Sequence, residues 1–92
     1  MKRIFKYVLE PVESQFICLP LYSKILSAES QLDDIVLYVL VDDSTSAKTP
    51  VNIVVKGTGH DANDLDGLKF LNTVKLRDGA LMFHVFCSTL ET

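Results

Sequence analysis

The sequence DIVLYVLV at residues 34–41 decides the fold class of this chain. It is rich in β-branched and aromatic residues and is shorter than a typical helix with its own caps, so it predicts a β-strand. The sequence ALMFHVFC at residues 80–87 has the same character. Both segments are apolar at consecutive positions, which is typical of strands that are covered on both faces. We therefore expect strand 34–41 to be central in a sheet.

Shorter apolar segments around these two predict further strands. They cover residues 3–9, 15–19, 21–26, 51–56 and 70–77, while 80–88 completes a hairpin with 70–77. The dipeptide Asp78-Gly79 suits the positive φ angles of the turn in that hairpin. The polar sequence DDSTSAKTP at residues 42–50 predicts a second hairpin, between 34–41 and 51–56. The expected fold is all-β, a small barrel or sandwich of about six or seven strands, with a short helical turn as an option near residues 62–68.

The composition indicates one folded domain over residues 1–92. The chain is 48% hydrophobic and 23% charged with a net charge of -3, which argues against intrinsic disorder. It has no apolar run of about 18 residues, so we expect no membrane span. Nine basic residues scattered among twelve acids do not form the clustered charge that DNA or RNA polymers require. Charged residues also interrupt the apolar stretch that a signal peptide would need, so we expect a cytoplasmic protein.

The two strands that are apolar on both faces, 34–41 and 80–87, indicate how the protein assembles. A chain this short buries only about 60–65% of its unfolded surface when it folds alone. One thin β layer can hardly cover both sides of two such strands, so we expect a homo-oligomer, either a dimer or a tetramer. A small closed barrel with residual apolar surface is the alternative. If strand 34–41 forms the interface, replacing Val39 or Val41 with Asp should dissociate or unfold the protein.

The sequence Lys56-Gly57-Thr58-Gly59-His60 is the most informative candidate site. Two glycines one residue apart allow a tight turn whose N–H groups point outward, and such a nest receives a phosphate or another anion. Thr58 would add a hydroxyl group, and His60 a ring donor or a stacking surface. The spacing matches neither the dinucleotide fingerprint nor the P-loop. A structural turn or bulge is therefore the alternative to a ligand loop.

Other reactive residues give weaker signals. Tyr38 interrupts an aliphatic strand and is the preferred residue for stacking on a base, with a core position as the alternative. Cys18 and Cys87 lie in apolar runs and are expected to be buried free thiols. His84 lies in a strand-like run, where a satisfied core or interface histidine is expected. No spacing indicates a metal site, a cofactor or a catalytic group.

The whole chain resembles a family of small proteins encoded by phages and prophages. The resemblance rests on IFKYVLE at 4–10, LYVLVD at 37–42, KGTGH at 56–60, FLNTV at 70–74 and ALMFHVF at 80–86. Members of that family usually carry Trp where this chain has Tyr38, and often an aromatic residue where it has Val55 or Lys56. These differences leave the identity of a stacking residue open.

The resemblance implies a relation to phage immune-evasion sponges, which assemble as small homo-oligomers and sequester the cyclic oligonucleotide signals of bacterial CBASS defence. A sponge for a signal such as cyclic GMP-AMP needs no catalytic group. Residues 57–60 would donate to a ligand phosphate and Tyr38 would cover a base. A basic residue among Arg3, Lys6, Lys56, Lys75 and Arg77 would offset the negative charge of the ligand.

Two other functions stay open at this point. A protein-binding inhibitor or virion accessory protein would use a strand edge or an apolar patch to engage a host or phage protein. A small hydrolase of a signalling nucleotide would use His60 and nearby acids as catalytic or metal-binding groups.

Overall fold

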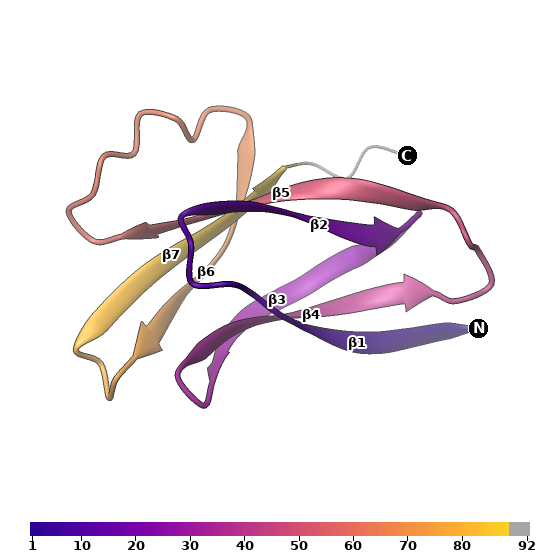
Figure 1. The fold of residues 1–92 in the computed structure, drawn as a ribbon, viewed down its shortest axis with the longest axis horizontal. Coiled ribbons are helices and arrows are strands. Elements are labelled where there is room, and N and C mark those ends of the chain that lie inside the picture. Colours follow the sequence, from indigo (N-terminus) through magenta and orange to yellow (C-terminus); the bar gives the residue numbers. More distant parts are fainter. Residues whose placement is uncertain (89–92) are drawn as a thin grey trace.

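The computed structural model describes residues 1–88 and is all-β, as the sequence predicts (Figure 1). Its seven strands are β1 (Lys2–Val8), β2 (Ser14–Pro20), β3 (Lys24–Gln31), β4 (Asp34–Asp42), β5 (Lys48–Gly57), β6 (Leu68–Leu76) and β7 (Leu81–Ser88). The optional helical turn near 62–68 does not form, because this segment consists of turns that lead into β6.

The strands form two antiparallel sheets, with the orders β1-β4-β3 and β2-β5-β7-β6. β4 is the central strand of its sheet, which confirms the expectation from its composition. The hairpin predicted between 34–41 and 51–56 is wrong, because β1 and β3 pair with the two edges of β4. The polar segment after β4 instead carries the chain across to the other sheet, where β5 pairs with β2 and β7.

The third predicted strand starts later than the sequence suggests. Residues 21–23 form a turn in which Tyr22 has a φ of 65°. The backbone N–H and the hydroxyl group of Ser23 both donate to the carbonyl oxygen of Pro20, at 3.2 and 2.6 Å. The turn therefore shifts β3 from the expected residues 21–26 to Lys24–Gln31.

The hydrophobic core lies between the two sheets. Alternate residues of β4, among them Leu37, Val39 and Val41, face the second sheet and are at most 1% exposed. Ile53 and Val85 face them from the second sheet and are fully buried. The interface role expected for Val39 and Val41 is therefore wrong, because this face of β4 is already covered within one chain.

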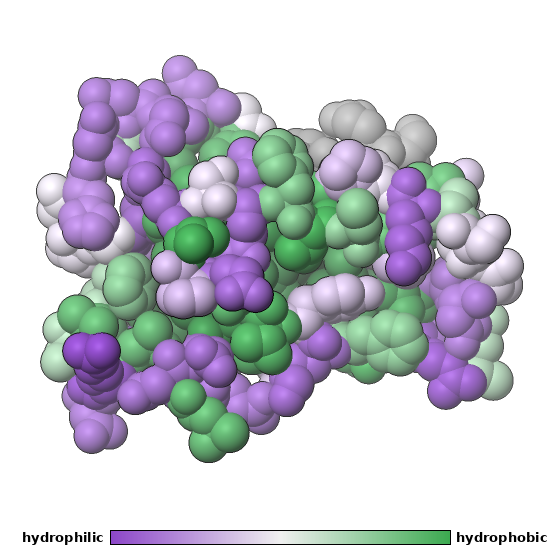
Figure 2. Space-filling view, in the orientation of Figure 1, coloured by the Kyte–Doolittle hydropathy of each residue, from purple (hydrophilic) through white to green (hydrophobic). Residues whose placement is uncertain are grey.

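The sandwich is closed along one side and open along the other. On the closed side β3 lies beside β6, and the Asn72 side chain donates to the carbonyl oxygen of Ala28 at 2.8 Å. On the open side, no backbone pairing joins β1 to β2 in the described part of the chain. Figure 2 shows hydrophobic side chains gathered on this side, where Phe5 is 43% exposed although its side chain points toward the core.

Two tight turns at one end of the sandwich contain non-glycine residues with left-handed backbone. In the turn between β3 and β4, Leu32 and Asp33 have φ values of 51° and 63°. In the turn between β6 and β7, Arg77, Asp78 and Gly79 have φ values of 51°, 55° and 88°. The predicted hairpin and the positive φ angles at Asp78-Gly79 are confirmed, although the left-handed segment begins one residue earlier.

Candidate functional site

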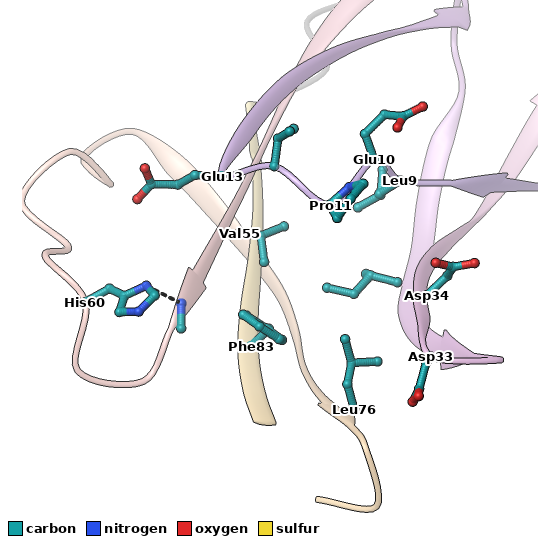
Figure 3. Close-up of a pocket in the computed structure, with 13 residues that line it drawn as sticks. Leu9, Glu10, Pro11, Glu13, Asp33, Asp34, Val55, His60, Leu76 and Phe83 are labelled. Atoms are coloured by element: carbon teal, nitrogen blue, oxygen red, sulfur yellow. Dashed lines mark hydrogen bonds between the residues drawn. The ribbon is translucent and has the colours of Figure 1, made fainter. Parts of the chain in front are cut away.

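A cavity of about 350 Å³ opens at the end of the sandwich near these turns (Figure 3). Apolar residues from both sheets and from the link between β1 and β2 form its walls, namely Leu9, Pro11, Val12, Ile35, Val55, Leu76 and Phe83. Surfaces of this kind exclude water from a flat apolar group such as a nucleobase. The cavity is therefore a concave, ligand-sized site formed by both sheets.

Acidic side chains surround the mouth of this cavity. Glu10, Asp33 and Asp34 lie on one side of it, whereas His60 lies across from them (Figure 3). Carboxylates accept hydrogen bonds and donate none, so this rim suits the amino groups of a base or the hydroxyl groups of a ribose. The same charges disfavour a phosphate inside the cavity.

A pocket of about 500 Å³, named the basic pocket after its cations Lys75 and Arg77, borders the cavity and also holds the carboxylates of Asp33 and Asp78. It is lined by Ser30, Leu32, Asp33, Lys75, Arg77, Asp78 and Gly79. Asp33 lines both hollows, and its Oδ1 accepts a hydrogen bond from the backbone N–H of Arg77 at 3.0 Å. Leu76 contributes to the cavity wall, while its neighbours Lys75 and Arg77 contribute to the basic pocket. Two cationic side chains therefore line a pocket that shares Asp33 with the apolar cavity.

Backbone strain is concentrated at the same place. Of five non-glycine residues with positive φ, four belong to the two turns that line the basic pocket, namely Leu32, Asp33, Arg77 and Asp78. Left-handed backbone costs about 1–3 kcal/mol at each such residue, and strain of this kind clusters at ligand-binding turns. The Leu32 side chain is 94% exposed, so burial of that side chain does not offset the cost.

The loop at residues 57–60 uses most of its backbone donors internally. The N–H of Gly57 donates to Nδ1 of His60 at 3.2 Å, and that of His60 donates to the carbonyl oxygen of Gly57 at 3.1 Å. The N–H of Thr58 donates to the carbonyl oxygen of Met82 at 3.3 Å. In this geometry the loop does not present the row of outward donors that the anion-nest hypothesis requires. Gly57 and His60 instead line the cavity, whereas Thr58 and Gly59 do not.

Gly57 has a packing reason to be glycine. A Cβ atom at this position would lie 2.7 Å from Cε1 of His60, which is closer than real Cβ contacts. The absence of a side chain therefore allows the imidazole ring to fold back over the end of β5.

Lys56 is engaged in ion pairs on the outer side of the four-stranded sheet. Its Nζ lies 2.6 Å from Oε1 of Glu13 and 3.0 Å from Oδ1 of Asp64, and its side chain is only 7% exposed. The hydrogen bond to Glu13, followed by that to Asp64, raises the pKa of Lys56, while the same ammonium group lowers the pKa of Asp64. Lys56 thus attaches the loop after β5 to the β1–β2 link, and its charge is already balanced.

The side chains of Thr58, His84 and Thr73 form a hydrogen-bonded series on the same outer face, which the sequence did not predict. Nε2 of His84 lies 2.8 Å from Oγ1 of Thr58, and Nδ1 lies 2.9 Å from Oγ1 of Thr73. His84 is therefore satisfied by hydroxyl groups, although it lies on the outer face of the sheet rather than in the core. The spacing of Thr58 and Thr73 in the sequence gives no signal for this contact, because it depends on the pairing of β6 with β7.

Tyr38 lies far from this loop in the architecture. It is half-buried on the outer face of the three-stranded sheet, between Lys6 of β1 and Ser27 of β3. The structure therefore does not bring Tyr38 and residues 56–60 together within one chain. A pocket that contains both would require a second copy.

The two cysteines differ in environment. Both are free thiols, but only Cys87 is buried, and burial raises its pKa. Cys18 is exposed, which corrects the expectation that both would be buried. It belongs to the edge strand β2, where its side chain alternates with the inward-facing Leu19.

Within residues 1–88, no group of three or more His, Cys, Asp or Glu side chains is placed to hold a metal ion. No helix in that range is long and apolar enough to cross a membrane.

Comparison with known proteins gives a family but no characterised relative. Neither the curated proteins nor the solved structures contain a significant match to this chain. One family model, described as a domain of unknown function, matches residues 1–92. The chain therefore belongs to the DUF7352 family.

Proposed function

We propose that this protein binds a cyclic oligonucleotide defence signal and sequesters it without catalysis, as a phage immune-evasion protein in the cytoplasm of the bacterial host. The observation that supports the proposal best is the apolar cavity beside the pocket of Lys75 and Arg77, with Asp33 shared between them. An apolar hollow, hydrogen-bond acceptors and adjacent cations are the three features that a nucleotide requires of its binding site.

The charges orient the ligand in this site. A base enters the cavity between the walls of the two sheets, and carboxylates at the rim accept hydrogen bonds from its amino group or from a ribose hydroxyl group. The acidic rim repels phosphate, so the phosphate remains outside the cavity. There it meets Lys75 and Arg77, which line the neighbouring pocket.

This site replaces part of the site expected from the sequence. Gly57 and His60 keep a place in it, since both line the cavity. Lys56 is paired with the carboxylates of Glu13 and Asp64. Lys75 and Arg77 therefore offset the negative charge of the ligand in its place. The link to phage sponges comes from the sequence resemblance, and a sponge requires only affinity and abundance.

Isothermal titration calorimetry with cyclic GMP-AMP as the probe tests this site. Arg77→Asn removes the charge and suits the left-handed backbone, because Asn tolerates positive φ. Lys75→Glu reverses the second charge. We expect each variant to weaken binding by about tenfold or more, as is usual when a charge-assisted phosphate contact is lost.

Lys48→Glu is the matched control, because Lys48 begins β5 at the end of the strand opposite to Gly57. It should bind like the wild type. Equal losses in all three variants would mean that only net charge matters and would reject the site. No binding by the wild-type protein to any cyclic oligonucleotide would favour the protein-binding alternative, whereas turnover would favour the hydrolase.

A further inference from the structure

The outer face of the three-stranded sheet is apolar although it points away from the core. Tyr38 and Leu40 of β4 lie on this face and are half-buried, whereas Val36 is only 1% exposed because the hydrogen-bonded side chains of Lys6 and Gln31 cross over it. Ile4 and Val8 of β1 flank these residues. Ile4 is 60% exposed and Val8 is 55% exposed. Scattered apolar residues are normal on a surface, but a contiguous set across neighbouring strands marks an interaction site.

The strand register arranges this face in three rows. One row contains Ile4, Leu40 and Lys24; the middle row contains Lys6, Tyr38 and Ser27; and the third row contains Val8, Val36 and Glu29. The first and third rows are related by reflection through the middle one. In each of them an aliphatic residue of β1 and one of β4 are followed by a charged residue of β3, and the charge has opposite sign in the two rows.

We propose that a second copy of this chain packs on this face, with Tyr38 on a twofold axis that lies in the interface and runs perpendicular to the strands. This symmetry reverses the order of the rows. Ile4 then meets the partner's Val8, and Leu40 lies opposite the partner's Lys6 and the partner's Gln31, whose side chains cover Val36. Lys24 meets the partner's Glu29, and the same pair forms again on the other side of the axis.

The charges of Lys24 and Glu29 favour a second copy of this chain as the partner that packs on this face. Lys24 and Glu29 lie at opposite ends of β3 and are both exposed, so the face complements its own rotated image. A twofold axis parallel to the strands would oppose rows of the same kind, and the charge pairs would be lost. Lys6 does not oppose its symmetry mate at the axis, because its Nζ donates to Oε1 of Gln31 at 2.6 Å, toward the end that carries Glu29.

This interface gives Tyr38 a role different from that of a base-stacking residue. The ring of Tyr38 packs against the partner's Tyr38, which buries the parts of Tyr38 and Leu40 that remain exposed in one chain. The dimer also satisfies the requirement that a strand apolar on both sides be covered on both sides. The proposal does not depend on the identity of the ligand, because the walls of the cavity lie between the two sheets of one chain.

Sedimentation equilibrium of the full chain tests the interface. The wild type should behave as a dimer, and Ile4→Asp should behave as a folded monomer, since Ile4 is exposed in one chain and its substitution leaves the core intact. Phe16→Asp is the matched control, because Phe16 is 72% exposed on the outer face of the other sheet. It should remain dimeric. A monomeric wild type, or an Ile4→Asp variant that stays dimeric, would overturn the proposal.

A reciprocal charge exchange gives a second test that does not depend on the apolar face. Lys24→Glu and Glu29→Lys each place like charges across the interface, so each should raise the dimer dissociation constant about tenfold or more. The double variant restores opposite charges and should return the dissociation constant to near the wild-type value. If the double variant is as weak as either single variant, the antiparallel arrangement is wrong. Circular dichroism of each variant confirms that it is folded.

Discussion

Replacing Asn72 with Ala should open the closed side of the sandwich. The Asn72 side chain is the donor to the carbonyl oxygen of Ala28 at 2.8 Å, and its Oδ1 accepts from the N–H of Thr73 at 2.9 Å. Ala28 is fully buried, so water cannot easily replace the lost donor. An unsatisfied buried polar group costs about 1–3 kcal/mol. With two groups affected, we expect the free energy of unfolding to fall by about 2–4 kcal/mol.

Urea unfolding followed by circular dichroism measures this change. For a domain of this size the same loss lowers the Tm by about 8–30 °C. Asn52→Ala is the matched control, because Asn52 also lies in a strand but within residues 1–88 its side chain makes a single, exposed hydrogen bond, which it accepts from Ser14 at 3.1 Å. It should cost less than about 1 kcal/mol. Equal effects of the two substitutions would refute the role of Asn72 in joining the sheets.

Asn72→Asp tests the same hydrogen bond by the pH dependence of the free energy of unfolding. Near neutral pH the carboxylate opposes the carbonyl oxygen of Ala28, so this variant should be less stable than Asn72→Ala. In acid the protonated carboxyl group can donate again, and the loss relative to the wild type at the same pH should shrink. A loss relative to the wild type that does not change with pH would contradict the donor role assigned to the amide.

Three further predictions concern the loops and the thiols. Gly57→Ala should displace the exposed ring of His60, because the new Cβ would lie 2.7 Å from Cε1 of that ring; NMR signals of the His60 ring that do not shift would refute the contact. The pKa of Asp64 lies below its ordinary value of 3.8 because of its ion pair, so its contribution to stability is present above pH 3.8 and is lost as the pH falls through the lowered pKa. Asp64→Asn should therefore flatten the acid limb of a plot of stability against pH, and an unaltered limb would exclude that contribution. A thiol-specific reagent should modify Cys18 in the native protein and Cys87 only after unfolding; equal rates would contradict their different burial.

The strands could be predicted because their local composition is unambiguous. Residues 34–41 and 80–88 have strong β-propensity, and Gly79 supports the turn between β6 and β7. The sheet to which each strand belongs could not be predicted in the same way. The polar segment after β4 has the composition of a hairpin loop, yet it joins two sheets, because β1 and β3 occupy both edges of β4. Which strands pair in a sheet depends on tertiary contacts, and turn residues alone do not determine it.

The candidate site was harder to predict than the fold. The glycines at residues 57 and 59 indicated backbone freedom, but no pattern in the sequence indicated that His60 and Met82 would accept hydrogen bonds from the N–H groups of that loop. The turn at Leu32 and Asp33 contains no glycine, so nothing in its composition predicts positive φ. The walls of the cavity come from six separate segments of the chain, and only the fold brings them together.

The face of β4 that points inward could not be deduced from a strand that is apolar on both sides. A shift of one residue would exchange Tyr38 for Val39. The structure places Val39 in the core and Tyr38 outside. For this reason Val39 and Val41 were the wrong residues to expect in an interface. The expectation that both faces of this strand are covered is the basis of the dimer proposed above.

The measurement that tests ligand sequestration most directly is recovery of the ligand after binding. Purified protein is incubated with a panel of cyclic dinucleotides and trinucleotides, separated from free ligand, denatured and analysed by chromatography. We predict that one member of the panel is retained by the wild type, retained poorly by Arg77→Asn, and released intact. Release of a cleaved product would contradict binding without catalysis, and retention of no member would contradict the proposed function itself.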